Sequence, residues 1–341
     1  MNQTLPYAFG GPVLSARLRV LPEDFKVDER IGFVASGSGE HWLLRVEKRG
    51  ANTAWAAARL ARFAGVAERE VGFAGRKDRH ALTRQYFSLP ARPGVALDWS
   101  GFEDPELCVL EASRHARKLQ RGALLGNRFE LLLREVSGDH AAAEQRLARI
   151  IADGVPNYFG EQRFGHASGN VAKARALFAG RRFGRDQRSL LISAARSQLF
   201  NAVLAARVAA GTWQQALAGD VFQLDRRSAI FGPEPVDDAL LARVARGEIH
   251  PTGPLWGSGE LRSQDETAAL ERAIVESEPE LTAGLASCGL CQERRALRLR
   301  AEDLSWRWPT ADTLSIEFSL PAGAYATVVL RELARISHTD P

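Results

Sequence analysis

The sequence predicts an α+β protein in which a helix-rich section interrupts a strand-rich one. Apolar and polar residues alternate in the first half of the chain, helical patterns follow, and alternation returns near the C-terminus. At 341 residues, the chain is long enough for about two domains. We therefore predict a discontinuous strand-rich domain of residues 1–152 plus 301–341, with residues 153–300 inserted into it.

The first section contains several stretches with strand periodicity and two with helical patterns. Asn52 can cap a helix that continues to about Phe63, and Gly65 can end it. A second helix is expected from about residue 139 to residue 152. The alternating stretches that predict strands are 16–20, 42–46, 71–73, 85–89 and 129–133.

The middle section is predicted to be largely helical, with few strands. Ser263 and Glu266 have the spacing of a capping box at the start of its last helix. After it, residues 314–320 alternate as a one-sided strand, and a helix is expected from about Ala324 to Ile336. The helical stretches of the middle section are 169–180, 188–210, 236–247 and 264–278.

Composition indicates a globular cytoplasmic protein. Hydrophobic residues make up 45% and charged residues 25%, with no apolar run of membrane-spanning length and no signal-peptide pattern. The three cysteines, Cys108, Cys288 and Cys291, are too few for a disulfide framework. Cys288 and Cys291 have the spacing of a zinc or redox pair, but no second pair or histidine partner accompanies them, so we predict no metal site.

The basic residues favour a nucleic-acid partner over a small neutral substrate. Only five of the 45 basic residues are lysine, and arginine presents a planar fork suited to phosphate, although an arginine-rich genome would have the same effect. Three separated clusters suit a long polyanion. They are Arg114, Arg117, Lys118 and Arg121; Arg181, Arg182, Arg185 and Arg188; and Arg294, Arg295, Arg298 and Arg300.

The motif search leaves one acidic residue in a basic loop as a candidate for chemistry. No phosphate-binding loop, dinucleotide fingerprint or metalloprotease motif is present, so no cofactor is predicted. The segment "AGRKDRHALTRQ" (74–85) places Asp78 among cations. Locally this is a turn residue or helix cap, but surrounding cations favour an ionised carboxylate, which suits a nucleophile or base. His80 has no serine or cysteine nearby to complete a triad.

Six segments, in order along the chain, have the form of family signature stretches. They are "PEDFKVDE" (22–29), "AGRKDRHALTRQ" (74–85), "GALLGNRFELLLREV" (122–136), "PNYFGEQRFG" (156–165), "SAARSQLFN" (193–201) and "LPAGAYATVVLREL" (320–333). Together they resemble the TruD family of tRNA pseudouridine synthases. The resemblance implies a pseudouridine-synthase catalytic domain with a mixed, mainly antiparallel sheet and flanking helices, interrupted by a largely helical TRUD domain.

The resemblance also assigns the site. It implies that Asp78 is the catalytic nucleophile, with Thr83 and Gln85 completing the pattern of its loop. Arg19 stands where some members have lysine, and Tyr325 replaces a frequent phenylalanine. The implied substrate-binding residues are Arg19, Phe25, Lys77, Asn127, Phe129 and Tyr325.

These residue types suit the implied reaction, which breaks the N1–C1′ bond of uridine and joins C5 of the base to C1′. No electrons, water or group carrier are consumed, which fits the lack of cofactor motifs. The base must be flipped out of its stack, and Phe25, Phe129 and Tyr325 are candidates to hold it by stacking. Asn127 can read a uracil edge. On local pattern alone, the stronger interpretation is that Phe129 is a core residue and Asn127 a turn residue.

We therefore predict a tRNA pseudouridine synthase, an isomerase acting at position 13. Its partner is tRNA, without a membrane or a small-molecule cofactor, and a monomer is favoured. The alternative is a non-catalytic RNA-binding or tRNA-chaperone module on the same fold. A tRNA methyltransferase is a third possibility, but the sequence has no recognisable cofactor loop for one.

Overall fold

The computed structural model describes residues 5–92, 94, 97–120, 122–165 and 168–338, and the chain divides into two compact units. The sheet unit comprises Val13–His140, Ala301–Gly323 and Ala334–Pro341. The helical unit comprises Met1–Pro12, Ala141–Arg300 and Ala324–Leu333. These packing units assign residues 1–12, 141–152 and 324–333 to the helical unit, whereas the sequence-based domains do not. The domain boundaries at 152 and 300 stay a prediction.

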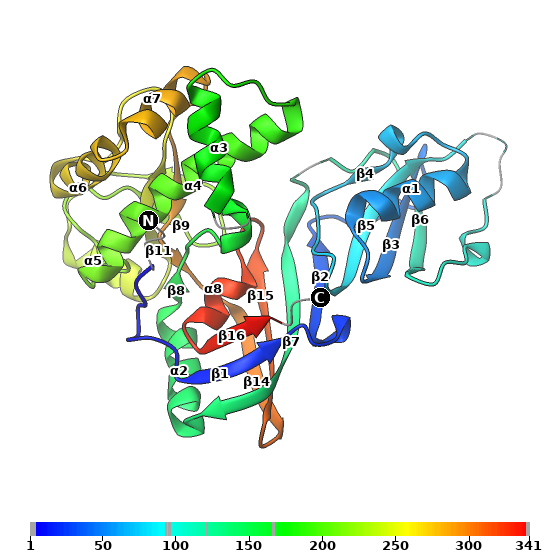
Figure 1. Ribbon diagram of the computed structural model, residues 1–341, viewed down its shortest axis with the longest axis horizontal. Helices are drawn as coiled ribbons and strands as arrows, with labels where there is room; N and C mark the ends of the chain where they lie inside the picture. Colours follow the sequence, from blue (N-terminus) through cyan, green and yellow to red (C-terminus); the bar gives the residue numbers. More distant parts are fainter. Residues whose placement is uncertain (1–4, 93, 95–96, 121, 166–167, 339–341) are drawn as a thin grey trace. The chain divides into compact units, whose positions relative to one another are not determined.

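The sheet unit is built on one large mixed sheet (Figure 1), and the predicted α+β class is confirmed. Its main strand order is β14-β15-β7-β2-β5-β3-β6. Outside this order, β1 pairs with β7 and β16, and β4 pairs with β5. The β2–β5 and β1–β16 pairs are parallel and the other pairs antiparallel. The strands are β1 (Leu14–Leu18), β2 (Phe25–Ile31), β3 (His41–Arg49), β4 (Gly72–Phe73), β5 (Leu82–Pro90), β6 (Leu107–His115), β7 (Leu124–Gly138), β14 (Glu302–Thr310), β15 (Thr313–Pro321) and β16 (Ala334–His338).

Helix α1 (Thr53–Ala64) lies against β3 and β5 (Figure 1) and forms as the sequence predicts. The Asn52 side chain accepts a hydrogen bond from the backbone N–H of Trp55, and Gly65 ends the helix in the left-handed conformation. Ala56 and Leu60 pack with Leu44, Val46 and Phe87 from the sheet. The apolar face of the helix thus covers one face of the sheet, beside the loop that carries Asp78.

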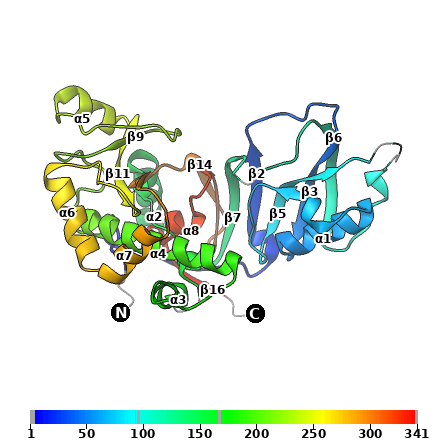
Figure 2. The ribbon, with the colours of Figure 1, turned by 90° about the horizontal axis from the view of Figure 1, so that it is seen from above.

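The helical unit contains the four predicted helices, and it also contains strands that the sequence patterns missed. Helices α3, α6 and α7 surround the long helix α4 (Figure 2). The unit holds a four-stranded sheet, ordered β10-β9-β11-β12, and a β8–β13 pair. Its elements are α2 (His140–Asp153), β8 (Val155–Pro156), α3 (Gly169–Phe178), α4 (Arg185–Ala209), β9 (Phe222–Leu224), β10 (Ile230–Phe231), α5 (Asp238–Ala245), β11 (Ile249–Leu255), α6 (Asp265–Glu276), α7 (Pro279–Ser287), β12 (Glu293–Ala296), β13 (Arg298–Leu299) and α8 (Ala326–Arg331).

Within the described residues, α4 is the one helix long and apolar enough by composition to cross a membrane. Half of its most apolar window is buried inside the structure. Its residues Leu191, Ala195 and Leu199 pack against α7 residues of the same unit. Helix α4 thus has the burial of a core helix.

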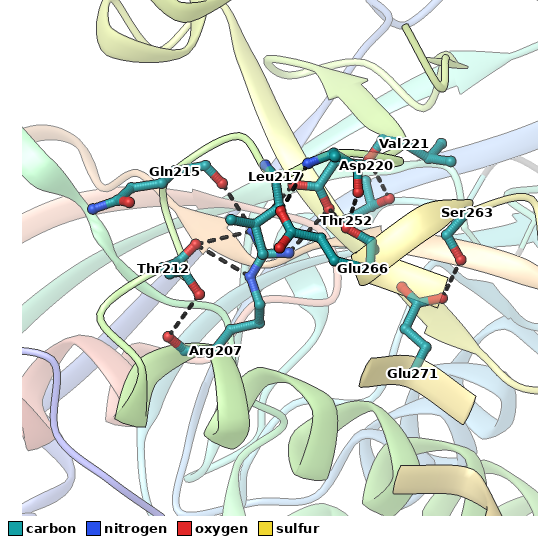
Figure 3. Close-up of polar contacts among 12 residues, drawn as sticks. Arg207, Thr212, Gln215, Leu217, Asp220, Val221, Thr252, Ser263, Glu266 and Glu271 are labelled. Atoms are coloured by element: carbon teal, nitrogen blue, oxygen red, sulfur yellow. Dashed lines mark hydrogen bonds and ion pairs between the residues drawn. The ribbon is translucent and has the colours of Figure 1, made fainter. Parts of the chain in front are cut away.

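A buried polar network ties the end of α4 to the loop that follows it (Figure 3). The Arg207 guanidinium is 1% exposed and contacts both carboxylate oxygens of Asp220, at 3.0 and 3.1 Å. It also donates to the backbone carbonyls of Thr212 and Gln215. Asp220 in turn accepts from Thr267 of α6. Since both charges are paired and hydrogen-bonded, the network is satisfied inside the unit.

Two local predictions were wrong. Ser263 does not cap α6, since its hydroxyl donates to Glu271 at 2.5 Å and Gln264 occupies the cap position. The C-terminal helix ends at Arg331 instead of near Ile336, and the chain continues as β16. Pairing of β16 with β1 supplies backbone hydrogen bonds there, so the sheet overrides the helical pattern.

Candidate active site

Asp78 lies in the loop between β4 and β5, in the sheet unit. Its side chain is 36% exposed, so the carboxylate is open to a ligand. One carboxylate oxygen, Oδ2, accepts a hydrogen bond from Nη2 of Arg19 at 2.6 Å. This ion pair joins the loop to the end of β1.

Arg19 reaches Asp78 because the backbone turns sharply after β1. Its φ of 63° is in the left-handed region, which is uncommon for a residue other than glycine. Its guanidinium carbon lies 4.1 Å from the centroid of the Phe25 ring, and the side chain is only 13% exposed. The cation is therefore held both by the carboxylate and by an aromatic face.

Phe25 lies beneath that cation, and Phe129 packs against Phe25. Their ring centroids are 6.1 Å apart in an edge-on arrangement, and Phe129 also contacts Phe318 at 5.6 Å. Phe25 is 3% exposed and Phe129 6%. In this arrangement Phe25 supports Arg19, and Phe129 packs against Phe25.

Lys77, the neighbour of Asp78, turns away from it. Its ammonium pairs at 2.8 Å with Glu29 of β2, and both side chains are buried. The other Glu29 oxygen accepts from the backbone N–H of Tyr86 on β5. Of these two cations, Arg19 contacts the carboxylate, whereas Lys77 anchors the loop to the sheet.

The rest of the loop is held by buried polar side chains. Gln85 of β5 donates to the backbone carbonyl of Gly75 at 2.6 Å and accepts from the Thr53 hydroxyl. Thr53 accepts from the backbone N–H of Lys77 at 2.9 Å. These contacts fix residues 75–77 against α1 and β5.

Lys48 of β3 completes this support and was not singled out from the sequence. It is fully buried, and its ammonium donates to the backbone carbonyls of Ala51 at 2.8 Å and Asp78 at 3.1 Å. Burial lowers the pKa of Lys48 to about 8, although Asp78 acts in the opposite direction. A signal existed: Leu44 and Val46 lie on the buried face, and alternation places Lys48 on it as well.

Asn127 lies on β7, directly opposite Glu29 of β2. Its side-chain oxygen is buried and has no hydrogen-bond partner in the part of the chain that the structure describes. A buried acceptor without a partner is costly unless a ligand satisfies it. This favours a binding role over that of a simple turn residue.

Tyr325 belongs to the helical unit, where it precedes α8. Its hydroxyl accepts from Nε of Arg163 at 3.0 Å, and its ring contacts Phe159 edge-on. Arg163 also donates to Ser193. The hydroxyl group of Tyr325, which a phenylalanine at this position would lack, thus orients Arg163.

The second predicted basic cluster is on the surface. Arg181, Arg182, Arg185 and Arg188 are all exposed, around the start of α4, and in the described residues none is ion-paired with an acidic side chain. In the first cluster, Arg114 and Lys118 donate to backbone carbonyls, and Arg121 lies outside the described residues.

The third basic cluster is not a surface for a polyanion, and this prediction was wrong. Arg294 pairs with Glu271 at 2.5 Å with both side chains buried. Arg295 donates to Asn157, while buried Arg298 donates to backbone carbonyls. The guanidinium groups of Arg294 and Arg298 thus satisfy acceptors inside the helical unit.

Metal-binding residues do not gather in the described residues, where no group of three or more His, Cys, Asp or Glu side chains could hold an ion. Cys108, Cys288 and Cys291 are free cysteines.

Comparisons with known proteins agree with the resemblance of the motifs. The family model described as tRNA pseudouridine synthase D (TruD) matches residues 3–175 and 172–333. The chain is 52% identical to tRNA pseudouridine synthase D of Xanthomonas euvesicatoria, over 99% of this chain and 96% of that protein. It is 48% identical to the protein of the same name in Hydrogenovibrio crunogenus, over 98% and 97%. The crystal structure of a putative tRNA pseudouridine synthase D from Methanosarcina mazei shares the fold, with a TM-score of 0.71, 21% identity and coverage of 96% and 95%.

Proposed function

Because the chain belongs to the tRNA pseudouridine synthase D family, we propose that this tRNA pseudouridine synthase acts at position 13 of tRNA, with Asp78 as its catalytic residue. The enzyme is an isomerase, since uridine and pseudouridine have the same atoms. One observation carries the assignment of the catalytic residue: Asp78 is an accessible carboxylate that the Arg19 guanidinium holds at 2.6 Å.

The reaction requires a carboxylate that is held in place while the glycosidic bond breaks. Arg19 fixes one oxygen of Asp78, and the open side of the carboxylate faces solvent, where a ribose or base can approach. Attack on the sugar, attack on the ring and removal of a 2′ proton are all within reach of such a group. The carboxylate is regenerated at the end of the reaction, so the isomerisation consumes no further reagent.

Recognition of the flipped nucleotide falls to neighbouring groups of the same sheet. The unsatisfied oxygen of Asn127 is suited to accept from the N3–H of uracil. Phe25 stabilises the position of Arg19, Phe129 packs against Phe25, and the two rings border the place of the base. The resemblance of its motif to that of the family also assigns a substrate-binding role to Tyr325, whose ring can stack on a base.

The tRNA backbone binds to the exposed arginines around the start of α4. Arg181, Arg182, Arg185 and Arg188 carry charges that no acidic side chain among the described residues neutralises. Arginine forks match phosphate oxygens, and each neutralised phosphate adds salt-dependent affinity without base specificity. We place the enzyme in the cytoplasm, where it meets tRNA.

Purified protein and unmodified transcribed tRNA test this proposal without added cofactor. Uridine labelled with tritium at C5 should release the label, and chemical mapping should find one pseudouridine, at position 13. The matched control is a transcript with cytidine at that position. RNA remodelling without any pseudouridine would instead establish the chaperone alternative, and a product at another position would refute the site specificity.

A further inference from the structure

Lys48 is a buried charge beside the Asp78 loop that the chemistry proposed above does not use. Its side chain has no exposed surface, and its ammonium donates to the carbonyls of Ala51 and Asp78. Burying an ammonium group lowers the stability of the fold unless its N–H groups donate hydrogen bonds to nearby acceptors. The two carbonyl groups that accept its hydrogen bonds therefore indicate the role of Lys48.

The two acceptors belong to different elements. Ala51 directly precedes Asn52, which caps α1, and Asp78 carries the candidate catalytic carboxylate. Lys48 thus ties the main chain of Asp78 to the start of α1. Arg19 binds the carboxylate itself, so the backbone and the side chain of Asp78 are held by different cations.

We propose that Lys48 is a positioning residue, whose buried ammonium holds the main chain of Asp78 where the carboxylate meets the substrate. The inference rests on the proposed catalytic role of Asp78. A charged donor forms hydrogen bonds about twice as strong as those of a neutral donor. Replacing or deprotonating the ammonium group therefore weakens its hydrogen bond to the Asp78 carbonyl.

The surroundings of Lys48 predict a pH dependence. Burial lowers its pKa to about 8, and of the two charged groups that face it, Asp78 raises the pKa while Lys77 lowers it. Its partners on the adjacent strands, Thr83 and Leu107, are uncharged. The ammonium is therefore present below about pH 8 and is lost above it, where activity should fall.

The test compares Lys48→Met, Lys48→Arg and Lys26→Met with the unaltered enzyme in single-turnover assays on saturating tRNA, over a range of about pH 6.5 to 9.5. Lys26 is the matched control, because it is a strand lysine of the same sheet, half-exposed and paired with Glu130. Lys48→Met should lower the rate constant about 10- to 100-fold at neutral pH, with tRNA affinity unchanged. The fall above about pH 8 should disappear in this variant.

Lys48→Arg should recover part of the rate and stay active at higher pH, because arginine keeps its charge. Lys26→Met should match the unaltered enzyme. A folded Lys48→Met variant with the normal rate and pH profile would overturn the inference. An unaltered enzyme that forms no pseudouridine would refute the proposed function instead.

A second measurement applies if Lys48→Met does not fold. In the unaltered protein, hydrogen-exchange protection of residues 74–81, corrected for intrinsic rates, should decrease as the pH rises through about 8. Helix α6 (Asp265–Glu276), which belongs to the helical unit, serves as an internal reference. Constant protection of residues 74–81 over that range would overturn the inference.

Discussion

The guanidinium of Arg19 and the carboxylate of Asp78 form a 2.6 Å ion pair although 59 positions separate them in the chain. The aromatic face of Phe25 supports the cation, and Lys48 holds the backbone of Asp78. The carboxylate is thus exposed to a ligand while the atoms around it are fixed. Such preorganisation is what a positioned catalytic group requires.

Replacing Asp78 by asparagine should abolish the reaction while preserving the fold. The amide has the same shape but cannot act as nucleophile or base, so tritium release should fall by at least about 10⁴-fold. Removal of a negative charge does not weaken binding of a polyanion, so tRNA affinity should be equal or tighter. Filter binding and tritium release measure the two properties. Normal release would refute the assignment of the catalytic residue.

Arg19 should contribute through its charge. Arg19→Met should lower the single-turnover rate constant about 10- to 100-fold, because the carboxylate loses the group that orients it. Arg19→Lys should lose less, since an ammonium can still pair with Asp78. Arg17→Met is the control, because Arg17 lies on β1 and pairs with Glu135. Equal rates in Arg19→Met and Arg17→Met would contradict this role.

The exposed arginines around α4 should determine the salt dependence of tRNA binding. Changing Arg181, Arg182, Arg185 and Arg188 together to alanine should weaken binding to all tRNAs. The slope of log Kd against log salt concentration should fall by about 0.7 to 0.9 for each phosphate that the variant no longer neutralises. Arg246→Ala is the control, since Glu248 already pairs with that arginine. An unchanged slope would exclude this surface from tRNA binding.

Arg207 should be essential for stability. Arg207→Met leaves the buried Asp220 carboxylate without its partner, so the free energy of unfolding should fall by about 3 to 5 kcal/mol. Arg128→Met, which removes an exposed pair with Glu317, should cost about 0.5 kcal/mol or less. Urea denaturation followed by circular dichroism measures both variants. Similar losses in the two would show that the Arg207 network is not buried in solution.

Tyr325 allows the ring and the hydroxyl to be separated. Tyr325→Phe removes the acceptor of Arg163 and should cost about 1 kcal/mol of stability, while the retained ring keeps the rate within about threefold. Tyr325→Ala should lose about 1 to 3 kcal/mol of base stacking and slow the reaction accordingly. Equal loss of activity in the two variants would mean that the hydroxyl, and not the ring, is required.

Local sequence patterns were sufficient to predict many of the helices and strands of this protein. The cap residue Asn52, the apolar spacing of α1 and its Gly65 end predicted that helix correctly, because helix ends depend on nearby residues. The strand alternation around β3, β5, β7 and β15 was also correct. The motif around Asp78 identified the loop, and the comparisons show the family to which such motifs belong.

The tertiary structure decided which charged residues face inward. Lys48 and Glu29 extend the buried faces of β3 and β2, yet only the arrangement of those strands around the loop gives each charge a partner. Arg294 belongs to a sequence cluster that looks like a surface but pairs with buried Glu271. A charge is solvated or satisfied inside according to its neighbours in space, and these neighbours come from segments far apart in the chain.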